Sequence, residues 1–252
     1  MMDLQLLDHL RPLVPSALKR PVRQLLDSWG TSRRSRTLQR VVAALRREVH
    51  AGAISPALWP ELREAWGNTA FSADAGYLAE IAARALARRG PVLECGSGLS
   101  TLVLGVIADA RQAGVWSLEQ DGEWLRLVSG ILAQFAVRRV ALWHTPLVLR
   151  GDYAWFDLSG CSLPGAFLHV FCDGPAVLPH WPAPIHLGWR RGVVPELLQL
   201  GIGFDEIVLD DADDPRCGAL CEYWNVLGVA TRIVETGSGP FVVGRRGSDS
   251  AT

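Results

Sequence analysis

Residues 91–105 constrain the fold of this chain more than any other stretch, with the sequence Pro-Val-Leu-Glu-Cys-Gly-Ser-Gly-Leu-Ser-Thr-Leu-Val-Leu-Gly. A short apolar run ends in Glu94, two glycines follow one residue apart, and a second apolar run then begins with helical spacing. Glycine lets the backbone turn sharply and approach a ligand, and free N–H groups at a helix start favour an anion. The stretch predicts a strand, a tight turn and a helix, with Ser100 or Thr101 as the N-cap.

A nicotinamide-dependent oxidoreductase is one class that such a turn suggests. The dinucleotide fingerprint needs a third glycine where this chain has Thr101, and it needs no acid at position 94. Both differences argue against a nicotinamide cofactor.

A second acid supports a different binding site. Val115 to Glu119 reads as a strand that ends in a carboxylate, 25 positions after Glu94. The carboxyl ends of neighbouring parallel strands line one crevice, so we expect Glu119 to accept hydrogen bonds from both hydroxyls of a ribose there.

Helical and strand patterns alternate along most of the remaining chain. This order predicts an α/β fold with a doubly wound, mostly parallel sheet and an antiparallel last strand. Further strands are expected at 139–144, 167–173, 204–209, 229–235 and 241–243, and helices at 72–88, 99–113, 121–135, 190–200 and 215–224. Residues 145–166 show no clean periodicity and are expected to form an ordered excursion with some aromatic surface.

The N-terminal region is expected to be a separate helical extension, at residues 1–67, with the main domain at 68–247 and a disordered tail at 248–252. Residues 10–50 contain ten arginines or lysines and only two acids, although the net charge of the 252 residues is -1. Short broken helices are expected at 3–29, a linker at 30–36, and helices at 37–50 and 56–66. The basic segment has two interpretations, contact with an anionic membrane or a protein partner, or simply a solvated helical face.

The five cysteines lie mostly inside apolar runs, which favours reduced thiols over a disulfide framework. Cys217 and Cys221 are one helical turn apart and are interpreted as helix packing. No apolar run reaches the ~18 residues of a membrane span. We therefore expect a soluble protein in the cytoplasm.

The pattern Glu94-x-Gly96-x-Gly98 resembles motif I of the class I S-adenosylmethionine-dependent methyltransferases, and the resemblance covers roughly residues 68–245. Ser100 stands where many members have a third glycine. The resemblance implies a Rossmann-like sheet of seven strands whose last strand is reversed, with S-adenosyl-L-methionine as the cofactor. The cofactor-binding residues that it implies are Glu94, Gly96, Ser97, Gly98, Ser100, Thr101, Glu119 and Asp173.

Three carboxylates follow two strands that are expected to be neighbours, Asp173 after the first, and Asp210 and Asp211 after the second. Oxygen ligands suit Mg²⁺, Mn²⁺ or Ca²⁺. The arrangement is similar to that of metal-dependent O-methyltransferases of sugars and small phenols, and this similarity makes the three aspartates candidate Mg²⁺ ligands. The alternative is structural, a turn at Asp173 and a helix N-cap cluster at residues 210–214.

Sugar-modifying members of that group carry another acid two residues after the first, acting as a base, where this chain has Pro175. Catalytic candidates are therefore Asp173 and two histidines of a proline-rich loop, His180 and His186. His144 is a further candidate. Packing or surface roles are the alternative for these histidines, and His169, within a strand, is assigned to the core.

The expected function is methyl transfer to a hydroxyl of a small molecule or glycan, with Mg²⁺ assistance as a hypothesis. The alternative is a catalytically inactive, methyltransferase-like binding protein, supported by Pro175. The Asn-Pro-Pro-Tyr signature of amino-group methylation is absent, and the main domain is acidic, so a nucleic-acid substrate is not expected. The acceptor's identity and the oligomeric state are left open.

Overall fold

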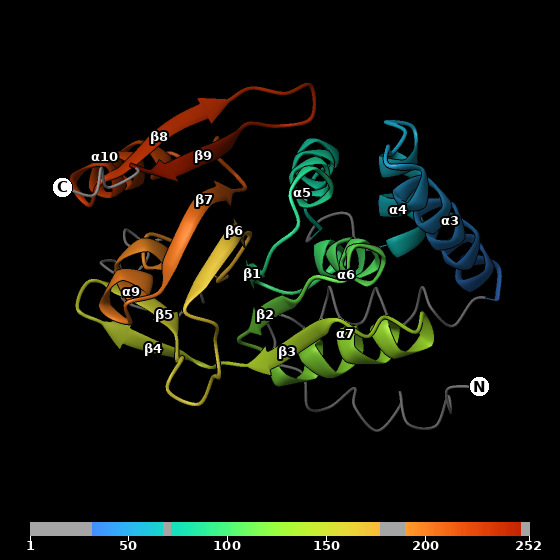
Figure 1. The fold of residues 1–252 in the computed structure, drawn as a ribbon, viewed down its shortest axis with the longest axis horizontal. Coiled ribbons are helices and arrows are strands. Elements are labelled where there is room, and N and C mark those ends of the chain that lie inside the picture. Colours follow the sequence, from blue (N-terminus) through green and yellow to red (C-terminus); the bar gives the residue numbers. More distant parts are fainter. Residues whose placement is uncertain (1–31, 68–71, 177–189, 248–252) are drawn as a thin grey trace.

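The computed structural model describes residues 32–67, 72–176 and 190–247. Its central element is a seven-stranded sheet in the order β3-β2-β1-β6-β7-β9-β8 (Figure 1). The first five of these strands are mutually parallel, whereas β9 runs antiparallel to both β7 and β8. The predicted sheet, mostly parallel with a reversed last strand, is confirmed. The strands are β1 (Val92–Cys95), β2 (Val115–Glu119), β3 (Val140–His144), β6 (Ala166–Cys172), β7 (Gly203–Leu209), β8 (Val229–Val234) and β9 (Phe241–Arg246).

Both faces of the sheet are buried, because successive strand residues enter two different hydrophobic clusters. On β1, Val92 belongs to one cluster and Leu93 to the other. This near-continuous apolar pattern is typical of parallel strands that are covered on both sides. Helices α5 (Ala75–Ala87), α6 (Leu99–Arg111) and α7 (Gly122–Gln134) cover the first face. Helices α3 (Ser32–Ala51) and α4 (Leu58–Trp66) form an outer layer, with α3 against α6 and α4 against α5. Helices α9 (Val193–Gln199) and α10 (Cys217–Val226) cover the second face (Figure 1).

The second face also carries an element that the sequence patterns did not predict. Strands β4 (Leu147–Arg150) and β5 (Tyr153–Phe156) form a separate antiparallel hairpin within the expected excursion. Trp155 and Phe156 are buried in the second cluster, so the aromatic side chains expected at the surface are core residues. A Cβ atom at Gly192 would lie 2.7 Å from the Trp155 ring, so the hairpin packs closely against the turn that leads into α9.

The described part of the N-terminal region packs into the main core. The apolar residues of α3 are buried in the cluster that contains α5 and α6. Ser32 to Arg36, expected to be a linker, is the first part of α3, so that prediction was wrong. Charged and polar residues of this stretch are compatible with a helix whose apolar face begins at Leu38. The broken helices expected at 3–29 and the tail at 248–252 lie outside the described residues.

Within the described ranges, no helix combines the length and the apolar character that crossing a membrane requires.

The packing of α3 leads to a stability prediction. Leu45 is fully buried on the face of α3 that packs into the main core. Leu45→Ala is therefore expected to lower the free energy of unfolding by about 3 kcal/mol, and the protein should still unfold in a single transition. Thermal unfolding followed by circular dichroism measures this. Arg47→Ala, at an exposed position of the same helix, serves as the control and should have little effect. A separate early transition that leaves the main one unchanged would show that α3 folds as an independent unit.

Candidate functional site

A cavity of about 410 Å³ lies at the carboxyl ends of β1, β2, β6 and β7. Ligand sites of open α/β sheets lie at this edge, where the loops after parallel strands meet. Loops after all four strands contribute, together with residues of α4, β5 and α7 and the segment before α5. The lining residues are Arg63, Ser72, Asp74, Gly96, Ser97, Glu119, Gln120, Asp121, Trp124, Phe156, Asp173, Gly174, Pro175, Ala176, Arg190, Asp210 and Asp211.

Two glycines bring the loops after β1 and β6 into direct contact. Gly96 has a φ of +96°, and a Cβ atom there would lie 2.9 Å from the backbone nitrogen of Gly174. The N–H groups of Asp173 and Gly174 both donate to the carbonyl of Cys95, at 3.0 and 2.7 Å. Position 96 therefore requires glycine for its backbone conformation and for this close approach. Gly98 differs, because its φ of 170° is extended and a Cβ atom there would meet nothing within 4 Å.

Glu94 lies beneath the β1 loop and does not line the cavity. Its side chain is buried, and its Oε2 accepts hydrogen bonds from the hydroxyls of Thr101, at 2.7 Å, and Ser117, at 2.5 Å. The Thr101 hydroxyl in turn accepts from the N–H of Gly98, at 2.8 Å. Burial raises the pKa of Glu94 to about 7. Glu94 therefore holds the turn through Thr101.

The start of α6 differs from the prediction. The helix begins at Leu99 with Gly98 as the N-cap, so Ser100 and Thr101 are not N-caps, and both are buried in the first turn. Neither they nor Gly98 line the cavity. The physical reason is that the Thr101 hydroxyl bonds back to the N–H of Gly98 and satisfies one of the free donors of the helix end. Of the predicted cofactor-binding residues, the cavity wall includes Gly96, Ser97, Glu119 and Asp173.

Glu119 is held at the cavity by the loops on both sides of it. Its Oε2 accepts hydrogen bonds from the backbone N–H of Ser97, at 3.1 Å, and from the Ser97 hydroxyl, at 2.6 Å. Its Oε1 accepts from the N–H of Asp121, at 2.8 Å, and Trp124 donates its indole N–H to the carbonyl of Ser97. Burial raises the pKa of Glu119 to about 7. These contacts fix the carboxylate and occupy both acceptor sites of Oε2, so the acceptor site that remains is on Oε1.

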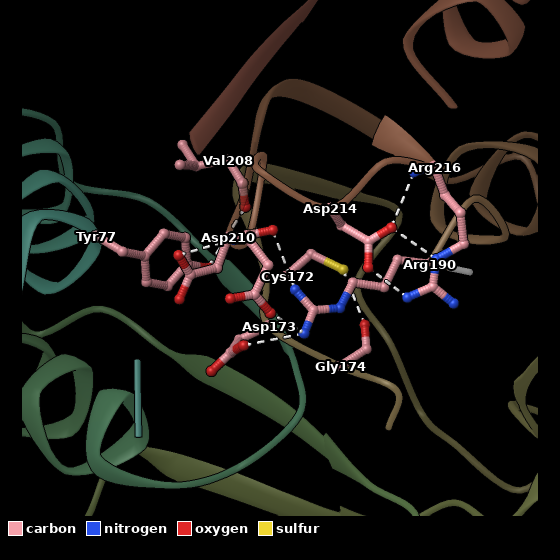
Figure 2. Close-up of polar contacts among 10 residues, drawn as sticks. Tyr77, Cys172, Asp173, Gly174, Arg190, Val208, Asp210, Asp214 and Arg216 are labelled. Carbon is pink, nitrogen blue, oxygen red and sulfur yellow. Dashed lines mark hydrogen bonds and ion pairs between the residues drawn. The ribbon is translucent and has the colours of Figure 1, made fainter. Parts of the chain in front are cut away.

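Three aspartates reach the cavity from the ends of β6 and β7, which are parallel neighbours as predicted. Figure 2 shows the guanidinium of Arg190 extending between Asp173 and Asp210. Its Nη2 lies 3.2 Å from Asp173 Oδ1 and 2.8 Å from Asp211 Oδ2, and its Nη1 donates to the carbonyl of Asp210 at 3.1 Å. Burial raises the pKa of Asp173 to about 6 and that of Asp210 to about 8. One arginine thus connects all three positions.

This arrangement does not fit the expected Mg²⁺ site. A divalent cation would have to lie about 2.0–2.6 Å from the carboxylate oxygens. The guanidinium of Arg190 already occupies the space beside these oxygens of Asp173 and Asp211. In the part of the chain that the structure describes, no three acidic, histidine or cysteine side chains are grouped to hold a metal ion. The physical reason is that the positive charge that these aspartates require comes from the protein itself.

The histidine candidates are not part of the described cavity wall. His180 and His186 lie outside the described residues. His144 is exposed at the end of β3 and is not in the cavity wall. His169 is 1% exposed and its Nδ1 lies 2.8 Å from Glu206 Oε1, so its assignment to the core is confirmed.

Several wall residues were missed by sequence reasoning, above all Arg190, Arg63 and Trp124. Arg63 comes from the helical region that the sequence assigned to a separate extension. Arg190 follows a proline-rich stretch without periodicity, and the arginine pair at 190–191 is one of several arginine pairs in the sequence. Such a pair does not say which acid an arginine meets.

Comparisons with known proteins agree with the fold. No protein-family model and no curated protein matches the sequence. Among solved structures, a methyltransferase domain of METTL16 gives a TM-score of 0.52 at 12% identity, over 81% of this chain and 97% of that chain. The N-terminal domain of human METTL16 in complex with SAH gives 0.47 at 11% identity, over 65% and 63%. Precorrin-6y C5,15-methyltransferase from Geobacter metallireducens GS-15 gives 0.45 at 15% identity, over 67% and 88%.

The chain has the fold of the class I S-adenosylmethionine-dependent methyltransferases. The first of these similarities and the order and direction of the seven strands establish this. A sequence identity of 12% carries the fold and not the substrate.

The two glycines of the β1 loop give a matched pair of variants. Gly96→Ala is expected to lower the free energy of unfolding by roughly 1–3 kcal/mol, because alanine at a φ of +96° is strained and its Cβ meets the backbone of Gly174. Gly98→Ala should change it by less than half as much, since its Cβ enters open space. Chemical denaturation of both variants makes the comparison. Equal losses would contradict the close approach as the cause.

Glu94 predicts a pH dependence of stability. Its folded pKa, about 7, lies above the ordinary value of 4.5, so the folded state binds its proton more tightly than the unfolded state. The stability contribution is complete below about pH 4.5 and is lost as the pH rises through about 7, an effect of about 3 kcal/mol. Denaturant unfolding between pH 5 and 8 should show a smaller decline for Glu94→Gln than for the wild type. An unchanged decline would assign it to other buried acids.

Proposed function

We propose that this chain binds S-adenosyl-L-methionine in the cavity and transfers its methyl group to a hydroxyl of a small molecule or glycan. The observation that carries the proposal is the position of Glu119, a buried carboxylate fixed by Ser97 and Asp121 at the end of the strand beside β1. A carboxylate there is suited to accept a hydrogen bond from a ribose hydroxyl, through the free acceptor site of Oε1. The methyltransferase fold supports the same cofactor.

The cavity residues divide into two regions for this purpose. Glu119, Ser97 and Gly96 would hold the nucleoside side, where backbone and carboxylate lie close together. The ends of β2 and β7 are three strand spacings apart, roughly 14 Å, which leaves the aspartates after β6 and β7 for the reacting side. When bound, the cofactor supplies an electrophilic methyl group attached to a positively charged sulfur.

Charge favours a cationic cofactor and a small acceptor. Six carboxylates and two guanidinium groups line the cavity. An excess of negative charge attracts a cation and repels a polyanion such as nucleic acid. The cavity volume of about 410 Å³ also lies at the lower end of the range of small-molecule sites. These features support a neutral hydroxyl acceptor of modest size.

On the acceptor side, the protein's own groups would orient the hydroxyl. Asp173 and Asp210 line the cavity, and Arg190 holds the first of them in place. A carboxylate at hydrogen-bond distance from an acceptor hydroxyl orients the oxygen and can take its proton as the methyl group transfers. Rate enhancement in such a site comes from positioning and fixed charges.

Replacement of Glu119 tests the cofactor site. Glu119→Gln is expected to weaken binding of S-adenosyl-L-methionine and S-adenosyl-L-homocysteine about 10- to 100-fold, because hydrogen bonds to a charged group are lost. Calorimetric titration measures this. Glu123→Gln removes a charge four residues away, outside the cavity wall, and should leave the affinity unchanged. Equal effects of the two substitutions, or no binding by the wild type, would contradict the proposal.

Binding should also depend on pH in a defined direction. With the pKa of Glu119 at about 7, the carboxylate is protonated in much of the free protein below that pH. A ligand that needs the ionised form therefore binds more tightly as the pH rises toward 7 and reaches a plateau above about pH 8. The dependence of the affinity on pH should be weaker in Glu119→Gln.

Turnover with a panel of hydroxyl acceptors then separates an enzyme from a binding protein that has lost catalysis.

A further inference from the structure

The three aspartates and Arg190 form a cluster whose cation is buried and belongs to the polypeptide, although Asp211 itself is exposed. The side chain of Arg190 is 7% exposed, and that of Asp173 26%. The guanidinium reaches two carboxylates and one carbonyl at the ends of two strands, with distances of 2.8–3.2 Å. Carboxylates this close repel one another, and such a group requires a nearby cation.

The backbone at this cluster is strained on both sides of the ion pair. Arg190 has a φ of +45° and Asp211 a φ of +59°. The left-handed region costs a non-glycine residue about 1 kcal/mol or more, and such residues persist where the surrounding structure holds them. Among the described residues, four non-glycine residues have positive φ, and two of these are joined by the contact between Arg190 and Asp211. The contact is therefore maintained despite an unfavourable backbone conformation at both Arg190 and Asp211.

We infer that Arg190 acts as a built-in cation that takes the place of a divalent metal between the carboxylates of Asp173 and Asp211 and the carbonyl of Asp210, so that this site requires no metal ion. The bearing of this inference on catalysis rests on the proposed function, because it concerns the acceptor side of that site. Arg190 is a positioning residue here. Its guanidinium fixes Asp173 and Asp211 in the geometry that a metal ion would otherwise impose.

Removal of the arginine is expected to open a site for a divalent cation. Without the guanidinium, the two carboxylates and the carbonyl that it contacts lose their positive partner, and hard divalent cations prefer such oxygen ligands. Arg190→Ala is expected to bind Mn²⁺ at least about tenfold more tightly than the wild type, a difference of about 1.4 kcal/mol. Arg190→Lys keeps the positive charge and should not gain this binding.

The probe is MnCl₂, and electron paramagnetic resonance measures the ion that stays free. Arg191→Ala is the matched control, because the neighbouring guanidinium pairs with Asp152 and lies over Tyr223, outside the cavity wall. It should bind Mn²⁺ no better than the wild type. In Arg190→Ala, a second substitution, Asp173→Asn, should weaken the gained binding, because Asp173 is one of the two carboxylates that Arg190 contacts. A wild type that binds Mn²⁺ as tightly as Arg190→Ala would overturn the inference, as would a folded Arg190→Ala that binds none.

A second measurement, the midpoint of unfolding with and without MnCl₂, tests the inference even if Arg190→Ala is poorly folded. If the variant is destabilised, MnCl₂ should raise its unfolding midpoint, since a ligand that binds the folded state stabilises it. The midpoints of the wild type and of Arg191→Ala should not change with MnCl₂ or with a chelator. No rise in Arg190→Ala, or a rise of equal size in the wild type, would contradict the built-in cation. None of these measurements uses cofactor or acceptor, so failure of the proposed function would be recognised separately, in the titrations of Glu119→Gln.

Discussion

The contact between Gly96 and Gly174 is the constraint on which the rest of the site depends. It joins the loops after two neighbouring strands at a distance that no side chain permits, and the carbonyl of Cys95 accepts two N–H groups across it. With these loops closed together, the carboxylates at the ends of β2, β6 and β7 face one cavity. The site is therefore a property of backbone packing first and of its charged side chains second.

Buried acids organise the site at two levels. Glu94 lies below the cavity, where the hydroxyls of Thr101 and Ser117 donate to it, and it orders the turn without reaching a ligand. Glu119 lies one strand away and lines the cavity itself. Both are desolvated enough to have a pKa of about 7. The same residue type thus supports structure at one strand end and offers a binding group at the next, and burial alone does not tell the two apart.

How far the sequence predicts this structure depends on how local each determinant is. The strand, turn and helix around Gly96, the strand that ends at Glu119, and the reversed last strand follow from patterns of neighbouring residues, and these predictions agree with the structure. The hairpin at residues 147–156 was missed because its packing, with Trp155 buried against α9 and its preceding turn, depends on distant residues. Arg190 was missed for the same reason. Its partners lie 17 to 21 positions away in sequence, and only the folded sheet brings them together.

The position of β9 has a consequence for the order in which the chain assembles. This strand is the last one among the described residues, yet it lies between β7 and β8 and pairs with both, with Phe241, Val242 and Val243 buried. During synthesis from the N-terminus, β8 therefore has no partner in the sheet until residues 241–246 have left the ribosome, and the edge of β7 stays unpaired for as long. An open strand edge is a site for association with other chains. The growing polypeptide thus exposes the edge of β7 from the synthesis of residues 203–209 until residues 241–246 are available to pair with it.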